Sequence, residues 1–427
     1  MSSGNRWPAA GSFFFLACLA LFLTAAPALS GQTFEQRVDD IVSRARLKVG
    51  PLRFYPVLEF SQFGWVSNIY GEVSTERLIS DFVITPSPKL NVYFILRRRL
   101  ILSFTENPEY HFYFKSHRYN HFANNYRTEL SFPFFGSLII TAGFFSQSQR
   151  SLAVAELDRQ VETVSRGIRT EVSYETGRRI SFNLSGLFTR QEYNDILGPG
   201  GSADDLGRNL DRQEYNGELE ARYQAFTSSV FFFRAGYSRY LFLDEASNWK
   251  DSQSARFMFG FRLPSQGRLS GSLAAGFRKL LNPDSSANGY SGFIADTQFS
   301  YRLGGATFLS AGYNHDLMFS YLADVLFYIN DSFNTGLTVN IGRLLSVRIG
   351  CNYSLLRHSG LREGEIGVDE PVPPPGRTDR YGGFTVGFSL PVLRGLRAGL
   401  SYHYWTRPTG FPDKRDGHLV TFDLIRQ

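Results

Sequence analysis

Residues 382–405 read GGFTVGFSLPVLRGLRAGLSYHYW, and apolar residues alternate with small or polar ones on both sides of a turn near residue 393. Successive side chains of an extended strand point to opposite faces, so the stretch predicts two strands that each have one apolar and one polar face. The apolar residues are Phe384, Val386, Phe388, Leu390, Ala398, Leu400, Tyr402 and Tyr404. The fold depends on whether such faces meet a protein core or lipid.

The same alternation continues from residue 52 to the C-terminus, in stretches of about 10 to 14 residues. Short turns, such as TGRR at 176–179, regularly alternate with longer polar loops, of which 194–211 and 360–379 are the longest. This sorting predicts an all-β protein, a transmembrane antiparallel β-barrel of about 18 strands (16–18), with short periplasmic turns and long extracellular loops. A soluble β-sandwich gives no reason to sort its connections in this way.

At the start of the barrel we expect a first hairpin made of strands over 52–70 and 78–86. A turn at Ser87–Lys89 is expected to follow the second of these strands. The run RRRLILSFTENPEYHFYF at 97–114 is expected to be one long strand. With these assignments the strand count is even, which lets both termini lie in the periplasm. A turn at Arg97–Arg99 would break that parity.

The polar faces of the expected strands carry charge, which a sandwich core could not bury but a water-filled lumen can. The apolar faces are rich in Phe and Tyr, so we expect them to meet lipid; a soluble all-β repeat or propeller is the alternative. The predicted lumen-lining residues are Arg169, Glu171, Glu218, Glu220, Arg222, Arg256, Arg262, Arg348 and Arg397.

The first 30 residues resemble a secretory signal peptide, with Arg6 before an apolar run and small residues before a cleavage site near Ser30. A lipoprotein signal at Cys18 is the alternative, but the apolar run continues beyond it. We therefore expect a signal peptide (1–30), a short periplasmic segment (31–50) that includes a brief amphipathic helix, and the barrel (51–427). The mature chain would keep one cysteine, Cys351, and so no internal disulfide.

The last strand resembles the signal that directs outer-membrane barrels to the barrel-assembly machinery. A polar residue, a glycine and alternating hydrophobic residues stand at the expected spacing, although the usual terminal aromatic residue is missing. The residues at these places are Arg415, Gly417, Val420 and Phe422. This resemblance implies the bacterial outer membrane, and it implies outer-membrane lipid and lipopolysaccharide as surroundings.

No catalytic or metal motif stands out among the seven histidines. His315-Asp316 could form a rim pair in an outer-membrane enzyme, and Asp204, Asp205 and Asp211 could bind calcium, but a solvated loop explains the three aspartates better. Arg97–Arg99 could contact lipid phosphate or line the lumen. We predict no cofactor, no metal and no enzymatic activity, and the net charge of +6 gives no reason to expect a nucleic-acid partner.

Two stretches, KVGPLRFYPVLEFSQFGWVSNIYG and SDFVITPSPKLNVYF, together with strands such as YNGELEARYQ, resemble β-barrel porin families found beside exopolysaccharide export genes. The elements that match are Pro56 through Asn68, Ser80-Asp81 and Pro86-Ser87-Pro88. The resemblance implies an outer-membrane conduit for a secreted polymer such as polysaccharide, with periplasmic polysaccharide-export proteins as partners. It supplies no functional residues.

These observations together predict an outer-membrane channel for a polar solute or polymer, since a barrel of 16–18 strands encloses a water-filled lumen. Selection would depend on lumen width and on rings of charge. Two alternatives remain at this point: an outer-membrane enzyme that hydrolyses lipid or peptide, and a structural or adhesion barrel plugged by residues 31–50 or by loops that fold inward.

Overall fold

The computed structural model describes most of the chain. The described residues are 34–66, 80–135, 137–151, 160–176, 179–196, 206–226, 229–263, 267–281, 289–321, 325–342, 344–361, 378–393, 396–407 and 415–426. The predicted signal peptide with Ser30, and also Asp204 and Asp205, lie outside them.

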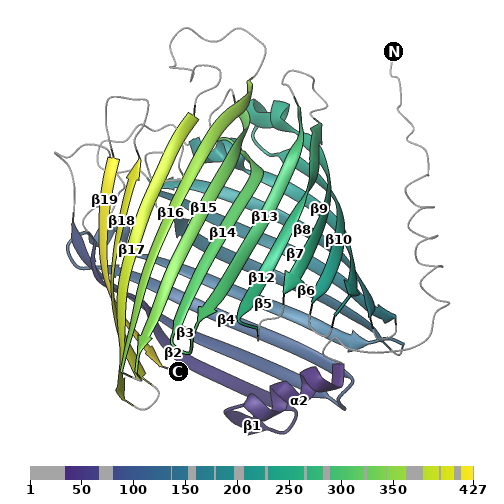
Figure 1. The fold of residues 1–427 in the computed structure, drawn as a ribbon, viewed down its shortest axis with the longest axis horizontal. Helices are drawn as coiled ribbons and strands as arrows, with labels where there is room; N and C mark the ends of the chain where they lie inside the picture. The colour runs from purple at the N-terminus through teal and green to yellow at the C-terminus, as the bar shows by residue number, and fades with distance from the viewer. Residues whose placement is uncertain are drawn as a thin grey trace.

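Long antiparallel strands make up nearly all of this structure, together with one helix and three short 3₁₀ turns (Figure 1). The helix α2 (Phe34–Arg44) and the 3₁₀ turns η2 (His117–Tyr119), η3 (Leu206–Leu210) and η4 (Glu245–Lys250) are not part of the wall. The strands are β1 (Leu47–Val49), β2 (Leu52–Val66), β3 (Asp81–Leu96), β4 (Leu100–Tyr113), β5 (His121–Pro133), β6 (Leu138–Ser151), β7 (Gln160–Thr176), β8 (Ile180–Ile196), β9 (Arg212–Gln224), β10 (Val230–Phe242), β11 (Ser252–Leu263), β12 (Leu269–Leu281), β13 (Tyr290–Leu303), β14 (Thr307–Phe319), β15 (Val325–Ile341), β16 (Leu345–Leu361), β17 (Thr378–Leu393), β18 (Leu396–Arg407) and β19 (Arg415–Arg426). Among the described residues, no helix is long and apolar enough to cross a membrane.

The sheet closes into a barrel. Each strand from β2 to β19 pairs antiparallel with its neighbours in sequence, and β19 pairs back onto β2, with Leu419 opposite Val66. The short β1 lies beside the lower end of β2, with Val49 opposite Leu52. Eighteen strands therefore form the wall, which confirms the predicted fold class and strand number.

The first hairpins differ from the prediction. Ser87–Lys89 do not form a turn but lie inside β3, which continues to Leu96. The turn is instead at Arg97–Arg99, where the Arg99 N–H donates to the Leu96 carbonyl at 2.9 Å. The residues 97–114 are thus a turn followed by β4 rather than one long strand. Because one expected turn was wrong and one unexpected turn is present, the two errors compensate and the parity is kept.

Prolines explain the first of these errors. Pro86 and Pro88 interrupt the pairing of β3 with β4, which is present at Ile84–Phe112 and resumes only at Leu90–Glu106. Proline has no N–H to donate to that ladder. The same residues keep their places opposite β2, so the strand continues through a sequence that resembles a turn.

The two faces of the wall have opposite chemistry, as β11 illustrates. Phe257 and Phe259 are 54% and 59% exposed and point outward, whereas Met258 between them is 7% exposed and points into the barrel. Outward-facing apolar side chains recur on nearly every strand. An outer surface of exposed aromatic and aliphatic residues is stable only in contact with lipid.

The strand connections sort by length between the two ends of the barrel (Figure 1). Turns such as the one at Arg97–Arg99 and the one around Gly304 lie at the lower end, whereas the longer described connections that carry η2 and η4 join the opposite ends of their strands. In outer-membrane barrels the short turns face the periplasm, so the lower end is the periplasmic end.

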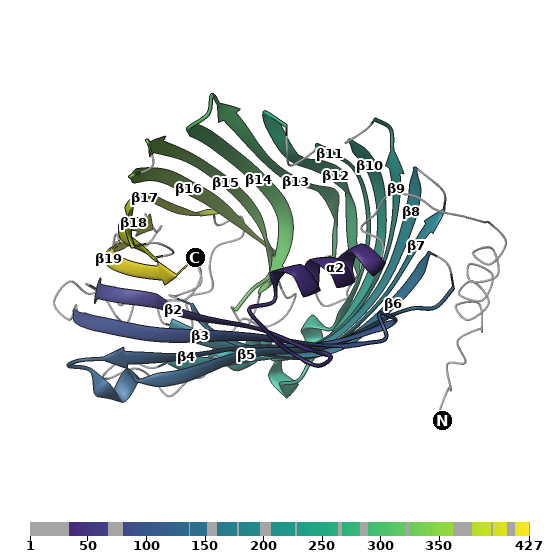
Figure 2. The ribbon, with the colours of Figure 1, turned by 90° about the horizontal axis from the view of Figure 1, so that it is seen from below.

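Helix α2 lies across the lower opening, against the inner wall (Figure 2). Its apolar residues Phe34 and Val38 are 6% and 0% exposed, and they pack on Ile95 and Ile101. Ile95 shares its face of β3 with Lys89, which lines the interior. The segment 31–50 thus contributes a helix that covers part of the periplasmic mouth.

The lipid-facing surface can be tested at Cys351, which lies on β16 opposite Thr335 and Phe384 and shares its face with the exposed Ile349. In protein refolded from residue 31 and inserted in vesicles, Cys351 should resist a water-soluble maleimide and react with a lipid-soluble one. Asn352→Cys in a Cys351→Ser background places the thiol on the opposite, inner face and should react with the water-soluble reagent. Equal rates at the two positions would contradict the assignment of faces.

Candidate functional site

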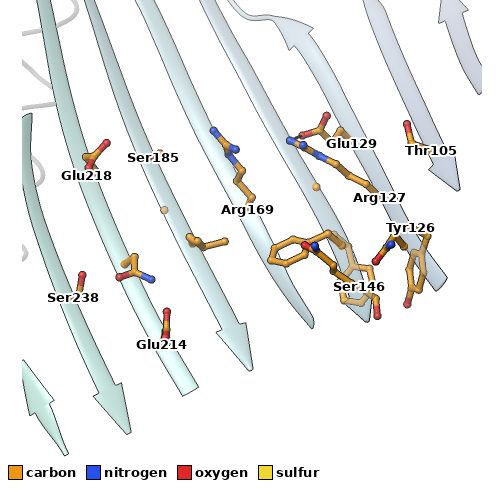
Figure 3. Close-up of a pocket in the computed structure, with 18 of the residues that line it drawn as sticks. Thr105, Tyr126, Arg127, Glu129, Ser146, Arg169, Ser185, Glu214, Glu218 and Ser238 are labelled. Atoms are coloured by element: carbon orange, nitrogen blue, oxygen red, sulfur yellow. Dashed lines mark hydrogen bonds and ion pairs between the residues drawn. The ribbon is translucent and has the colours of Figure 1, made fainter. Parts of the chain in front are cut away.

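The interior of the barrel holds a polar cavity of about 830 Å³. It is lined by inward-facing side chains of strands β3–β12, and Figure 3 shows Arg127, Glu129, Arg169 and Glu218 on this wall. Five cations and three carboxylates border it, so its lining has an excess of positive charge. These charged residues are Lys89, Arg127, Arg169, Arg256, Arg278, Glu129, Glu214 and Glu218.

The nine residues predicted to line a lumen occupy the inner face of the wall in two groups. Arg169, Glu218 and Arg256 border the large cavity. Four more continue the same faces of β7, β9 and β11 toward the periplasmic end, namely Glu171, Glu220, Arg222 and Arg262. Arg348 and Arg397 border a separate hollow of about 380 Å³ on β16–β18.

Most of the cavity charges are neutralised by a neighbour on the same face. Arg169 pairs with Glu171 at 2.9 Å between Nη2 and Oε2, and Arg256 pairs with Glu218. Residues two apart along a strand, or opposite one another on adjacent strands, share a face, so these pairs follow from the strand geometry. The inner face therefore carries many charged side chains, most of which have an oppositely charged partner beside them.

Glu220 is the centre of the most crowded of these groups. It is 5% exposed and accepts from both Arg222 and Arg234. Arg234 also lies over the ring of Phe232, at 4.6 Å from its centroid, and Arg262 lies over the same ring at 5.3 Å. Two guanidinium groups thus share one carboxylate, and the third lies beside them on the Phe232 ring, which leaves this part of the wall positive.

The hollow on β16–β18 has no carboxylate among its lining residues. Arg397 donates to the Ser389 hydroxyl at 3.3 Å, and His403 contacts the hydroxyls of Thr385 and Ser401. Arg348 borders the same hollow. The interior therefore has one wall of paired charges, and on the other wall a hollow that two arginines border without a carboxylate.

The upper end of the interior is narrowed by connections that fold inward. The pairing of β13 with β14 ends at Ala295–His315, and above it the tip of the β14–β15 hairpin leaves the wall. Phe319 at this tip packs edge-on against Tyr240 and Phe242 of β10. The tip is joined there by η3 and η4 in one apolar cluster: Val161, Tyr193, Leu210, Tyr240, Phe242, Trp249, Leu280, Leu317, Phe319, Tyr321, Leu326 and Phe327.

Two buried cations hold this tip in place. Arg278 is 7% exposed and donates to Asp316 at 2.8 Å, to the Tyr240 hydroxyl at 3.0 Å and to the Ser254 hydroxyl at 2.9 Å. Lys250 of η4 is fully buried and donates to the Ser320 carbonyl at 3.0 Å. Arg278 joins the wall to the hairpin tip, and Lys250 joins η4 to it. The inward position of the tip is therefore fixed by specific polar contacts as well as by apolar packing.

Several interior residues were missed by the sequence analysis. Arg278, Arg234 and the pair Arg127–Glu129 stand on inward faces, and the alternation of β5, β10 and β12 contains the signal that places them there. The inward fold of the β14–β15 tip left no such signal, because its contacts join residues far apart in the chain. The stacked rings of His111 and His121, 4.2 Å apart, were also missed, although these residues lie opposite each other on adjacent strands β4 and β5.

The contacts of the other candidate residues from the sequence point to structural roles. His315 and Asp316 do not form a pair, since His315 contacts Asp331 at 2.5 Å on one face of β14 and Asp316 contacts Arg278 on the other. Asp211 accepts from the Tyr193 N–H at 2.6 Å, and within the described ranges no group of three potential metal ligands is present. Arg98 forms an ion pair with Asp39 of α2.

The residues of the expected assembly signal lie on β19, between β18 and β2. Arg415 is opposite Arg407 of β18, and Gly417 is opposite Trp405. Val420 is opposite Trp65 of β2, and Phe422 is opposite Leu400 of β18. The strand closes the barrel; its role as a recognition signal stays a prediction.

The comparison with one solved structure supports the fold, and two others are similar at lower TM-scores. The siderophore receptor PirA from Pseudomonas aeruginosa is similar, with a TM-score of 0.50 and 10% identity over 89% of this chain and 70% of that one. OpdO from the same organism gives a TM-score of 0.49 and 12% identity over 87% and 97%. The FrpB iron transporter from Neisseria meningitidis gives 0.47 and 11%, and this chain covers 63% of it.

No family model matches the chain, and neither does any curated protein. The resemblance to exopolysaccharide-associated porins therefore finds no support in the comparisons. The closed antiparallel barrel, its lipid-facing surface and the likeness to PirA together identify a β-barrel of the bacterial outer membrane, in contact with membrane lipid.

Arg278→Ala should lower the free energy of unfolding by about 2–4 kcal/mol, because it leaves Asp316 and the hairpin tip without their buried donor. Urea unfolding of vesicle-inserted protein measures this. Arg348→Ala, which removes an exposed cation from the other wall, serves as control and should change stability by less than about 0.5 kcal/mol. Equal effects would contradict the role of Arg278 in holding the tip.

Proposed function

We propose that this protein is a gated outer-membrane channel for small polar solutes, with a preference for anions. The observation that carries the proposal is the charged, polar cavity of about 830 Å³ enclosed by an 18-stranded wall. Barrels of this size enclose water, and charge on their inner faces sets which solutes pass.

The preference for anions follows from the balance of interior charge. Cations exceed carboxylates around the large cavity, and Arg348 and Arg397 border a hollow whose lining has no carboxylate. A cationic lining stabilises an anion that has left bulk water, and it repels a cation. The nine residues of the sequence prediction would act here as lumen lining.

Gating is proposed because both ends of the interior are narrowed by separate elements. Helix α2 covers part of the periplasmic mouth, and the β14–β15 tip with η3 and η4 fills part of the extracellular end. An extended polysaccharide would have to displace both, so a small solute fits the interior better than a polymer. A permanently plugged barrel is the second candidate, favoured by the buried anchors Arg278 and Lys250.

Single-channel recording in a planar bilayer tests this proposal with protein refolded from residue 31 and with a variant lacking 31–50. We expect small or intermittent steps from the longer protein and larger, longer-lived steps from the deletion variant. Silence from both, with folding and insertion verified, would overturn the channel proposal and favour the plugged barrel.

Val38→Asp tests the gate without a deletion. Val38 is fully buried between α2 and the wall, so an aspartate there should release the helix and raise the open probability several-fold. Ser43→Asp adds the same charge on an exposed part of α2 and should leave gating unchanged. If both variants behave like the parent protein, α2 is not the gate.

Glu218→Gln tests selectivity. The change leaves Arg256 without its ionic partner beside the cavity and should raise the chloride-to-potassium permeability ratio by about twofold or more. Reversal potentials in a salt gradient give this ratio. Glu192→Gln removes a carboxylate from the outer face of β8 and should have no effect. A shift of equal size in both variants would mean that the measured ions do not pass the cavity.

A further inference from the structure

The outer face of β7–β10 carries a hollow between two belts of side chains. Strand register places residues of these four strands in rows across the wall. One row consists of Thr170, Gly186, Gly217 and Tyr237, and the row above it of Ile168, Phe188, Tyr215 and Arg239. The next row toward the extracellular end begins with Arg166 and Arg190.

Paired glycines form the floor of this hollow. Gly186 lies directly opposite Gly217, and nothing lies within 4 Å of the position that a Cβ at Gly217 would take. The hollow has a volume of about 910 Å³, and Ile168, Phe188 and Tyr237 are among the residues around it. Ile168 and Tyr237 are each 52% exposed on this face, so the walls are apolar and aromatic and open toward lipid.

Exposed arginines stand directly above the hollow. The side chains of Arg166 and Arg190 are 58% and 52% exposed, and both approach Glu192, at 4.0 Å and 2.9 Å. Arg239 borders the hollow itself. Arg166 and Arg190 thus share the single carboxylate of Glu192, and Arg239 adds a third cation beside the hollow, on a surface that otherwise faces lipid.

The height of these arginines matches the lipid headgroups. Arg166 and Arg190 lie ten residues above Thr176 and Ile180, the lower ends of β7 and β8. At a rise of about 3.3 Å per residue and a tilt of about 40°, this is roughly 25 Å, the height of the apolar band of an outer-membrane barrel. The hollow lies below that level, at the depth of acyl chains in the extracellular leaflet.

We propose that this surface binds a phosphorylated glycolipid of the outer leaflet, of the lipid A type. A phosphate would bind Arg166 and Arg190, and an acyl chain would fill the glycine-floored hollow beside Phe188 and Tyr237. Guanidinium groups recognise phosphate through paired, charge-assisted hydrogen bonds, and the apolar hollow gains stability when a hydrocarbon chain covers it. The proposal concerns the outer wall and is independent of conduction.

Native mass spectrometry of detergent-released, folded protein tests it by titration with bisphosphorylated lipid A. Arg166→Gln with Arg190→Gln, and separately Gly217→Leu, should each lower the affinity about tenfold, since the first removes the charge-assisted contacts and the second fills the hollow. Glu192→Gln removes the competing carboxylate and should tighten binding. Lys279→Gln changes an exposed cation on the outer face of β12, two strands beyond β10 and not among the residues that line the hollow; it is the matched control and should bind like the parent protein.

Two comparison lipids distinguish the contribution of the arginines, which would bind phosphate, from that of the hollow, which would bind an acyl chain. Phosphatidylethanolamine should bind at least tenfold more weakly than lipid A, and removal of the lipid A phosphates should abolish the difference between the parent protein and the double arginine variant. Unchanged affinity in the double variant, or an equal loss with Lys279→Gln, would overturn the proposal. A hollow occupied by a second copy of this chain, seen as a dimer without bound lipid A, would overturn it as well.

Discussion

The structure depends on the closure of the sheet between β19 and β2. In a lipid bilayer there is no water to satisfy backbone N–H and C=O groups, so a spanning sheet is stable only without free edges. Closure divides the side chains of every strand into two sets, because alternate residues must point outward to lipid or inward to the lumen. The exposed phenylalanines of the outer surface and the arginines of the inner surface follow from this single requirement.

The interior shows how a wall can carry many charges without high cost. Isolated ions against protein lose hydration, but pairs such as Arg169–Glu171 and the group around Glu220 replace part of that loss with charge-assisted hydrogen bonds. The same surface also supports elements that narrow the lumen. Near the periplasmic end, isoleucines of the wall pack against α2. Near the extracellular end, Arg278 and Tyr240 contact the β14–β15 tip.

Much of the fold was predictable, since the alternation that begins with Phe384 and Val386 is a local signal repeated on every strand. The fold class, the strand number and the outer-membrane location were predicted correctly. The turn expected at Ser87–Lys89 was wrong, because two prolines interrupt one ladder of a strand that continues on its other edge. The turn at Arg97–Arg99 was missed because Arg97 and Arg98 take positive φ angles of 47° and 56°, which usually require glycine or asparagine.

Less of the candidate site than of the fold could be predicted from the sequence. Strand alternation suffices to suggest which charges face inward, and Arg234 or Arg278 could have been added by the same reasoning. The contacts that narrow the lumen join distant parts of the chain, as Lys250 and Ser320 illustrate, so no local pattern encodes them. Under the proposed function, the solute is selected by the shape that these contacts leave and not by a motif.

The position of α2 also constrains the order of events during assembly. The helix precedes β2 in the chain, and β2 is one side of the seam that closes the barrel. Its binding surface on Ile95, Ile101 and Ile139 exists only once β3–β6 are paired, and that surface faces the enclosed side. The helix can therefore bind only after these four strands have paired, so its docking follows the formation of this part of the wall and does not direct it.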